Sequence, residues 1–174
     1  MPELPEVETV RRGLERHVVG RRIERVEIGR ERTVRRTSAD AVIAGLTDTV
    51  ILAADRAGKY LLLPLDSGDE VMIHLRMSGQ LLVAASEAPR PPHTHVVMHL
   101  GPDPFGDRNE LWFVDPRTFG EVVVFDPTRA EVEVPEIARL GVDPIAGDLS
   151  LTVLRRLLLS RRRLLKPLLL DQHV

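Results

Sequence analysis

The sequence predicts a mainly β fold with flanking helices. Residues 6–18 carry apolar side chains at helical spacing, and Gly20 follows them as a stop signal. Residues 50–125 contain repeated short runs that are apolar or alternating, separated by Gly, Pro, Asp and Ser, as is typical of strands joined by turns. After Asp126 the composition changes, and a leucine-rich stretch at 151–160 indicates a return to helix.

Composition limits the class of protein. At 174 residues with 43% hydrophobic content the chain can build one core, and it has no apolar run long enough to span a membrane. The absence of cysteine excludes disulfides, thiolate metal ligands and a cysteine nucleophile, and it suits a cytoplasmic protein. The formal net charge of −2 is unusual for a nucleic-acid-binding protein, although arginines form local clusters.

The first elements follow from periodicity and capping. Glu6–Val18 places Val7, Val10, Leu14 and Val18 on one face, which predicts an amphipathic helix. Arg22–Arg30 alternates and predicts an exposed strand, and Ser38 is a good cap for a short helix ending near Gly45.

Two β-type runs are expected between Val50 and Leu65, on either side of residues 55–59. The second run, Tyr60–Leu65, is apolar on both sides and should be buried. Lys59 stands at its rim. It either extends to water as an ordinary strand-end lysine or presents a positive charge to a phosphate or a base.

Residues 70–83 predict a hairpin whose turn contains Ser78 and Gly79. The same turn region carries His74, Arg76 and Met77. A methionine there either folds back onto the sheet or acts as a flexible apolar wedge between DNA bases.

Further strands are expected at 96–100, 110–114 and 121–125. His93 and His95 precede the first of them, but no carboxylate or cysteine lies nearby, so no metal site is expected. In the loop 115–120, Phe119 is either an anchor in its own domain or, with Arg117, a second element that stacks in the minor groove.

The C-terminal part is charged and poorly periodic at 127–135, and Ser150 is a good cap for a helix at 151–160. The cluster of Arg155, Arg156, Arg161, Arg162, Arg163 and Lys166 is either a solvated helix face or a phosphate-binding surface. The chain ends within an apolar helical segment, and we expect it to be the N-terminal part of a longer protein.

The first residues allow covalent chemistry. Removal of Met1 would leave Pro2 with a secondary amine, a type of group whose pKa lies near 8. Such an amine can attack an electrophilic carbon and form an iminium, and the adjacent Glu3 could move protons. The alternative is a simple helix start, with Pro5 in the first turn and Glu6 and Glu8 facing the positive end of the helix dipole.

Seven motifs resemble, in order, the bacterial formamidopyrimidine-DNA glycosylase family: PELPEVET, RAGKYLLL, IHLRMSG, HTHV, DPRTFG, LGVDP and LLKPLLLDQ. The resemblance implies a two-sheet antiparallel β-sandwich with an N-terminal helix, followed by the beginning of a helix–two-turn–helix domain. The implied boundaries are a catalytic sandwich at 1–130, a linker at 131–148 and the truncated DNA-binding domain at 149–174.

The resemblance also implies roles for individual residues. Pro2 would be the Schiff-base nucleophile at C1′ of the damaged nucleotide, and Glu3 the general acid/base. Glu6 would be a supporting carboxylate, and Lys59 would contact the lesion or the backbone. The DNA-contacting residues would be His74, His93, Arg117 and Lys166, and the extruded base would be replaced by Met77, Arg117 and Phe119. Thr118 and Arg76 depart from the family pattern, since an arginine and a smaller residue are expected there.

The implied function is base-excision repair, in which a monomeric cytoplasmic glycosylase and abasic-site lyase removes 8-oxoguanine and formamidopyrimidines from double-stranded DNA by β,δ-elimination. No cofactor is expected within this chain, because the family's four-cysteine zinc finger lies beyond it. Three alternatives stay open: an endonuclease VIII-like enzyme for oxidised pyrimidines, a non-catalytic damage-binding fragment, and an N-terminal-proline enzyme of the tautomerase kind.

Overall fold

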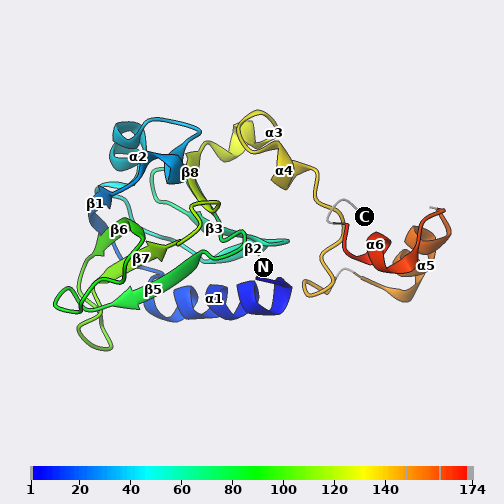
Figure 1. Ribbon diagram of the computed structural model, residues 1–174, viewed down its shortest axis with the longest axis horizontal. Coiled ribbons are helices and arrows are strands. Elements are labelled where there is room, and N and C mark those ends of the chain that lie inside the picture. Colours follow the sequence, from blue (N-terminus) through cyan, green and yellow to red (C-terminus); the bar gives the residue numbers. More distant parts are fainter. Residues whose placement is uncertain (1, 148, 161, 172–174) are drawn as a thin grey trace.

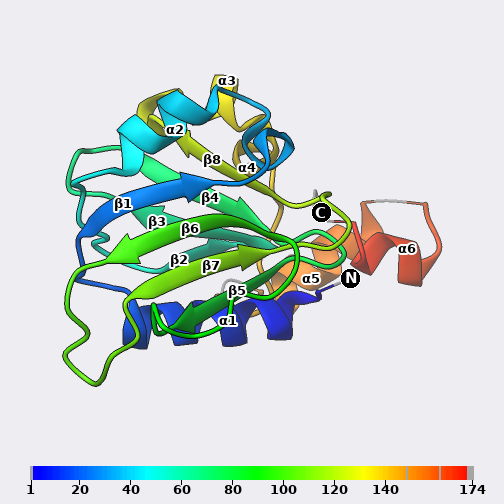
Figure 2. The ribbon, with the colours of Figure 1, turned by 60° about the vertical axis from the view of Figure 1, so that its left-hand side comes forward.

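Two four-stranded antiparallel sheets packed face to face form the body of the protein (Figures 1 and 2). The computed structural model describes residues 2–147, 149–160 and 162–171. One sheet has the order β1-β6-β7-β5 and the other β2-β3-β4-β8. The fold class predicted from the sequence is confirmed: a two-sheet sandwich preceded by a helix and followed by helices.

The strands are short and match most of the expected runs. The first sheet consists of β1 (Ile23–Ile28), β5 (Gln80–Ala84), β6 (Thr94–Leu100) and β7 (Glu110–Val114). The second consists of β2 (Asp55–Ala57), β3 (Tyr60–Pro64), β4 (Glu70–His74) and β8 (Glu121–Phe125).

Helices close the two open sides of the sandwich. Helix α1 (Leu4–His17) contacts β2 and β3 of one sheet and β5 of the other, while α2 (Ala39–Leu46) contacts β1 and β8. These helices therefore cover edge strands of both sheets, which would otherwise present unpaired backbone groups. The predicted cap of α2 is confirmed, since the Ser38 hydroxyl accepts a hydrogen bond from the backbone nitrogen of Ala41 at 3.1 Å.

The main core lies between the sheets, and two smaller clusters cover their outer faces. Val7 and Leu14 of α1 reach this core, as the helical periodicity predicted. On the outer face of the second sheet, Tyr60, Met72 and Val123 pack with Val134. This outer cover explains why central strands are apolar on both sides.

The predicted hairpin at 70–83 is wrong. Strand β4 pairs with β3 and β8, whereas β5 pairs with β7 in the other sheet, so the turn at Ser78 and Gly79 carries the chain across the sandwich. The first β run is also shifted. Val50 and Ile51 form only isolated bridges, and the expected turn residues Asp55–Ala57 form β2.

Beyond the sheets the chain forms short helical elements: a 3₁₀ turn at Pro127–Arg129, α3 (Ala130–Glu133), α4 (Pro135–Ala138), α5 (Leu151–Leu159) and α6 (Leu165–Leu169). Figures 1 and 2 show α5 and α6 as a separate group beside the sandwich. The cap at Ser150 is confirmed by a 3.2 Å bond from the nitrogen of Val153. The boundaries 1–130, 131–148 and 149–174 stay predictions, and Met1 and Arg161 lie outside the described residues.

Candidate functional site

The N-terminal corner brings three of the predicted site residues together. Glu3 is the cap residue of α1, and its backbone nitrogen donates a 2.9 Å hydrogen bond to the Glu6 carboxylate. Its own carboxylate accepts an ion pair from Lys59 Nζ at 2.7 Å. Lys59 is only 8% exposed, so its ammonium is held at this corner, and Pro2 lies partly exposed next to Glu3.

A cavity of about 260 Å³ opens at this corner. Its walls come from the start of α1, the turn between β2 and β3, residues 140–144 and residues 169–171. Glu3 and Lys59 both line it. The cavity therefore lies between the sandwich and the C-terminal segment, with an acid and a cation at its wall.

A buried arginine holds the segment 140–144 against the sandwich. Arg56 on β2 pairs with Glu8 of α1 at 3.2 Å and with Asp143 at 2.5 Å. It also donates a 2.8 Å hydrogen bond to the carbonyl of Gly58, next to Lys59. Hydrogen bonds from Arg11, Arg12 and Arg56 outweigh the effect of burial and lower the pKa of Glu8 to about 2, so this carboxylate stays charged at neutral pH.

Two loops at the same end of the sandwich expose apolar side chains. Met77 follows β4 and is 47% exposed, and Phe119 lies between β7 and β8 and is 44% exposed. Arg117 Nη1 lies 3.6 Å from Met77 Sδ. The structure thus brings together the two loops that the sequence marked as wedge candidates, with apolar side chains facing water.

Asp115 joins these two loops, and sequence reasoning missed it. Its buried carboxylate accepts hydrogen bonds from the Ser78 hydroxyl of one loop (2.5 Å) and from the backbone nitrogens of Arg117 (3.3 Å) and Gly120 (2.7 Å) in the other. A single carboxylate therefore sets the relative position of both wedge loops.

Close packing explains the glycines of the two loop motifs. A Cβ on Gly79 would lie 2.5 Å from the carbonyl oxygen of Leu75, and a Cβ on Gly120 would lie 2.6 Å from the ring of Phe113. Each loop also contains a residue with a positive φ angle: Arg76, near Gly79, at 54° and Thr118, near Gly120, at 55°. Such a conformation costs free energy for any side chain with a Cβ and is most unusual for a β-branched threonine, so the surrounding contacts must hold both loops in place.

His74 is buried at the end of β4, beside Tyr60 of β3, and Tyr60 directly follows Lys59. Burial and the neighbouring Arg76 lower its pKa to about 4, so the ring is neutral at physiological pH. Its Nδ1 accepts a 3.0 Å hydrogen bond from the backbone nitrogen of Arg76. The proton of the neutral ring is therefore on Nε2, which leaves one N–H donor.

The remaining predicted residues lie further out. His93 is exposed, and its carbonyl accepts a 3.0 Å hydrogen bond from the backbone nitrogen of Asp115, next to the wedge loops. Lys166 is exposed on α6, and its side chain forms no ion pair within residues 162–171 or with the described part of the sandwich. The structure does not bring it to the corner with Glu3.

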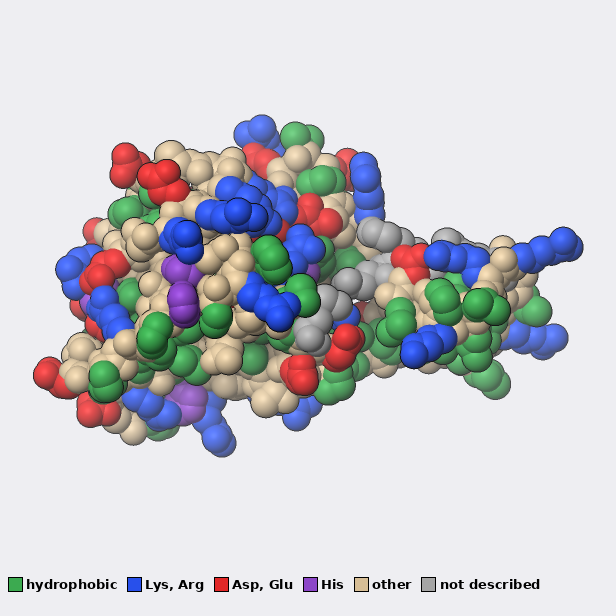
Figure 3. All heavy atoms as spheres, in the orientation of Figure 1, with side chains coloured by type: hydrophobic (Ala, Val, Ile, Leu, Met, Phe, Trp, Pro, Cys, Tyr) green, Lys and Arg blue, Asp and Glu red, His purple; other side chains and the backbone are tan. Residues whose placement is uncertain are grey.

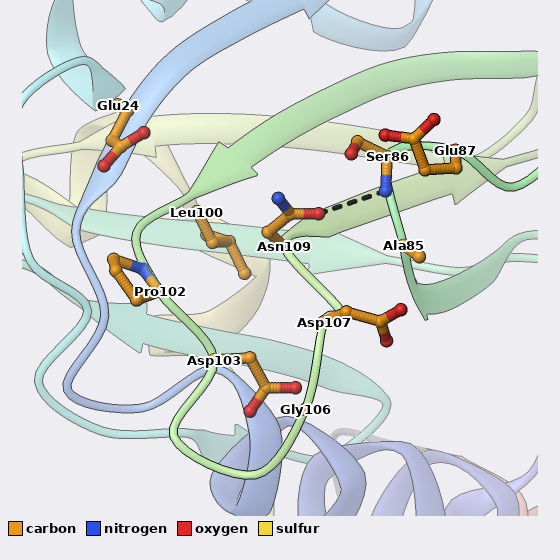
Figure 4. Close-up of a pocket in the computed structure, with 10 residues that line it drawn as sticks. All are labelled: Glu24, Ala85, Ser86, Glu87, Leu100, Pro102, Asp103, Gly106, Asp107 and Asn109. Atoms are coloured by element: carbon orange, nitrogen blue, oxygen red, sulfur yellow. Dashed lines mark hydrogen bonds between the residues drawn. The ribbon is translucent and has the colours of Figure 1, made fainter.

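A second cavity, of about 500 Å³, lies at the opposite end of the strands (Figure 4). Four carboxylates line it, from Glu24, Glu87, Asp103 and Asp107, and the Asn109 side chain accepts a bond from the Ser86 nitrogen. This acidic lining would repel a phosphate backbone, which leaves the N-terminal corner and the wedge loops as the candidate site.

The described residues offer no metal site beside these groups. Within the described ranges, no three His, Asp or Glu side chains are arranged to hold an ion. The chain has no cysteine, so its residues cannot form the four-cysteine zinc site that the resemblance implies. No helix in the described part of the chain is long and apolar enough to cross a membrane.

The comparison with protein families matches residues 1–122 to the formamidopyrimidine-DNA glycosylase N-terminal domain. A formamidopyrimidine-DNA glycosylase of Salinispora arenicola is 45% identical over 175 residues, which cover 99% of this chain and 58% of that protein. The one of Symbiobacterium thermophilum is 44% identical over 173 residues, with 99% and 54% covered. The chain thus spans a little over half the length of these curated relatives.

Solved structures lead to the same family. The Lactococcus lactis Fpg in complex with DNA containing an abasic site superimposes with a TM-score of 0.84 at 32% identity, covering 99% of this chain and 61% of that one. A complex of the same protein with DNA containing Fapy-dG gives a TM-score of 0.83 at 32% identity, with 98% and 62% covered.

Proposed function

Because this chain belongs to the formamidopyrimidine-DNA glycosylase family, whose N-terminal domain it contains, we propose that it carries the covalent chemistry of base excision. The proposed activity is removal of oxidised purines from duplex DNA, followed by cleavage at the abasic site. The observation that carries the proposal is the N-terminal corner, where Pro2 adjoins Glu3 and Glu3 pairs with Lys59. Glu3 and Lys59 line a cavity at the same end of the strands as the wedge loops.

The proposed reaction starts from Pro2 as the free N-terminal residue. Its neutral secondary amine attacks C1′ of the damaged nucleotide, and the glycosidic bond breaks, so that its electrons leave with the base. The bonded nitrogen gives up its proton to the Glu3 carboxylate, and Glu3 then acts as the general acid that delivers this proton to the sugar ring oxygen, which opens the ring to the cationic iminium. Loss of the phosphates on the 3′ and then the 5′ side follows by elimination, because the iminium accepts electrons from the adjacent carbons.

Positioning of Glu3 is supported by its contacts. The helix start fixes its backbone through Glu6, and Lys59 fixes its carboxylate. Both partners are themselves constrained, since Glu6 lies in the first turn of α1 and Lys59 is buried. A general acid held from two sides loses little freedom when substrate binds.

The wedge loops supply the second requirement of the proposed function. An enzyme that reacts at C1′ must take the nucleotide out of the stack, at a cost of a few kcal/mol. Met77 and Phe119 are exposed apolar groups that can fill the space left behind, and Arg117 can offer donors to the unpaired base. Lys59, His74 and His93 are the proposed phosphate contacts at this end of the strands, and Lys166 is a proposed DNA contact from α6.

Borohydride trapping tests the proposal. The chain is incubated with duplex DNA containing 8-oxoguanine or an abasic site and then reduced, which converts an iminium to a stable covalent adduct. A form with extra residues ahead of Pro2 makes its nitrogen an amide and removes its nucleophilicity. The matched control is Pro5→Ala, which changes a proline three residues away and leaves the N-terminal amine free.

We expect an adduct with the unmodified chain and with the Pro5→Ala control, and none with the extended form. An adduct that persists in the extended form would contradict the proposed nucleophile. Absence of any adduct on abasic-site DNA, at protein concentrations where the chain binds this DNA, would favour a non-catalytic binding module.

A further inference from the structure

The loop between β5 and β6 brings His93 to the same end of the sandwich as the wedge loops. The carbonyl of His93 accepts a 3.0 Å hydrogen bond from the backbone nitrogen of Asp115, the residue whose carboxylate joins the two wedge loops. The His93 side chain is exposed, and in Figure 3 histidine side chains (purple) reach the surface of the sandwich next to basic ones. The residues that hold His93 in this place therefore decide where its ring lies beside the wedge loops.

His93 has a strained backbone. Its φ angle is 68°, in the left-handed region that residues with a Cβ rarely adopt, so contacts on both sides must hold this conformation. On one side the hydroxyl of Thr94 donates a 2.8 Å hydrogen bond to the carbonyl of Pro91 and closes the turn. Pro91 and Pro92 restrict the chain just before His93, since their rings fix their own φ angles.

A cavity of about 390 Å³ lies between this loop and the first sheet. Its walls come from the end of β1, the loop residues Arg90, Pro91 and His93, and the first residues of β6. The cavity leaves room on one side of the loop, so polar contacts rather than close packing keep His93 in position.

Arg90 is the anchor on the N-terminal side of His93. Its guanidinium lies between two carboxylates of the first sheet, Glu27 on β1 and Glu110 on β7, with Nη1 2.8 Å from Glu27, and Nη2 3.0 Å and Nε 3.3 Å from Glu110. Strand β6 runs between β1 and β7, so the arginine bridges three strands. Most of its N–H donors are used in these bonds, which suits the residue to hold the loop and not to bind DNA itself.

The two carboxylates are themselves held in place. Glu110 is 2% exposed and also accepts a 2.5 Å hydrogen bond from Trp112 Nε1. His99 on β6 lies between the two carboxylates, with its ring nitrogens 2.6 Å from Glu27 and 3.1 Å from Glu110. Hydrogen bonds from Arg90 and His99 outweigh the effect of burial and lower the pKa of Glu27 to about 2, so this carboxylate stays charged at neutral pH. Partners on three strands therefore give Arg90 a fixed position.

We propose that Arg90 is a positioning residue for His93. Its pairs with Glu27 and Glu110 hold residues 90–93 in the conformation that places the His93 ring beside the wedge loops, where it can meet a DNA phosphate. This inference rests on the proposed function, in which His93 is a phosphate contact, and adds to it the residue that keeps this contact in place. Without Arg90 the strained φ of His93 relaxes, because the cavity leaves room for the loop to move.

A double-mutant cycle tests the inference. Binding to a duplex with a stable abasic-site analogue is measured for the unmodified chain, Arg90→Gln, His93→Ala and the double variant. Glu27→Gln weakens the same anchor from β1 and leaves the pair of Arg90 with Glu110, so it takes the place of Arg90→Gln in the cycle if that variant does not fold. The matched control is Arg25→Gln, which removes an exposed arginine that also pairs with Glu27, at 2.9 Å, but lies outside the loop.

An NMR measurement on the free chain accompanies the cycle. The ring protons of His93 sense the neighbouring ring of His95, whose centre lies 6.3 Å away. A change in the loop conformation therefore moves these signals, whereas a general loss of stability without a change in the loop leaves them in place. Urea unfolding of each variant measures that stability separately.

We expect Arg90→Gln and His93→Ala each to weaken binding about fivefold, and the double variant to weaken it by the same factor, because either change removes the same contact. Glu27→Gln should weaken binding less, and only where His93 is present. The His93 ring signals should shift in Arg90→Gln and Glu27→Gln. The Arg25→Gln control should match the unmodified chain in both measurements.

Three results would overturn the inference. The first is independent losses, in which the double variant binds about 25-fold more weakly than the unmodified chain, because Arg90 would then act on DNA without His93. The second is undiminished binding by His93→Ala, and the third is unshifted His93 signals in Arg90→Gln. All three are separate from the borohydride adduct of the unmodified chain, which tests the proposed function.

Discussion

Asp115→Asn should both destabilise the protein and separate the two wedge loops. The carboxylate accepts three hydrogen bonds, two on Oδ1 from Ser78 and Arg117 and one on Oδ2 from Gly120. An asparagine keeps only one acceptor oxygen. If that oxygen occupies the Oδ1 position, the amide nitrogen faces the backbone N–H of Gly120, so one bond is lost and two donors meet.

The expected cost follows from these contacts. A hydrogen bond to a charged group contributes about 1.5–3 kcal/mol, and a buried donor without an acceptor costs a further 1–3 kcal/mol or so. Together they lower the free energy of unfolding by about 3–5 kcal/mol. Because Met77 and Phe119 then lose their common anchor, we also expect weaker insertion into DNA beside an abasic site.

Urea unfolding measures the first effect, and the fluorescence of 2-aminopurine placed opposite an abasic-site analogue measures the second. Asp107→Asn is the matched control, since it makes the same chemical change at an exposed position. A loss below about 1 kcal/mol with unchanged m-value, together with unchanged fluorescence, would refute the role assigned to Asp115.

Three further predictions concern the residues around the corner. Arg56→Gln breaks the buried link to Asp143, so the free energy of unfolding should fall by about 3 kcal/mol and trapping should weaken, whereas the exposed Arg12→Gln should have little effect. His74 has a folded-state pKa of about 4 against about 6.5 unfolded, so the unfolded chain binds more protons between these values. Stability should therefore fall by up to about 3 kcal/mol as the pH drops from 6.5 to 4, and His74→Asn should remove this part of the pH dependence. Glu3→Gln should slow excision of 8-oxoguanine by about 100-fold or more while still allowing trapping on abasic sites, because the free aldehyde of an abasic site is already ring-opened and needs no protonation of the ring oxygen.

Each of these has a contradicting result. Equal stability of Arg56→Gln and Arg12→Gln would show that the link to Asp143 does not hold the segment. An unchanged pH profile in His74→Asn would assign the acid sensitivity to other groups. Excision by Glu3→Gln at the normal rate would remove Glu3 from the reaction.

Local patterns predicted the helices and most strands because the physics there is local. The apolar rows of α1 and the caps Ser38 and Ser150 act within a few residues of themselves, and the structure confirms all three. The turn at Ser78 and Gly79 was also found. Its chemistry reverses the chain but does not choose the sheet, so the strands on its two sides were wrongly paired with each other.

The residues that sequence reasoning missed act over long distances in the chain. Arg56 and Asp143 are 87 positions apart, and Arg36 and Glu121 are 85 apart. Buried charges of this kind leave no periodic signal, because each meets its partner only after the sheets assemble. Asp115, Arg56 and Asp143 did lie within motifs that resemble the family, which was the available sign that they matter.

The central claim is that the nitrogen of Pro2 becomes covalently attached to the deoxyribose. Lys59 is the competing amine, because its Nζ lies 2.7 Å from Glu3 and lines the same cavity. Mass spectrometry of peptides from the borohydride-reduced complex with abasic-site DNA separates the two. We expect the sugar remnant on the N-terminal peptide at Pro2, whereas a remnant on Lys59 would show that the lysine is the nucleophile.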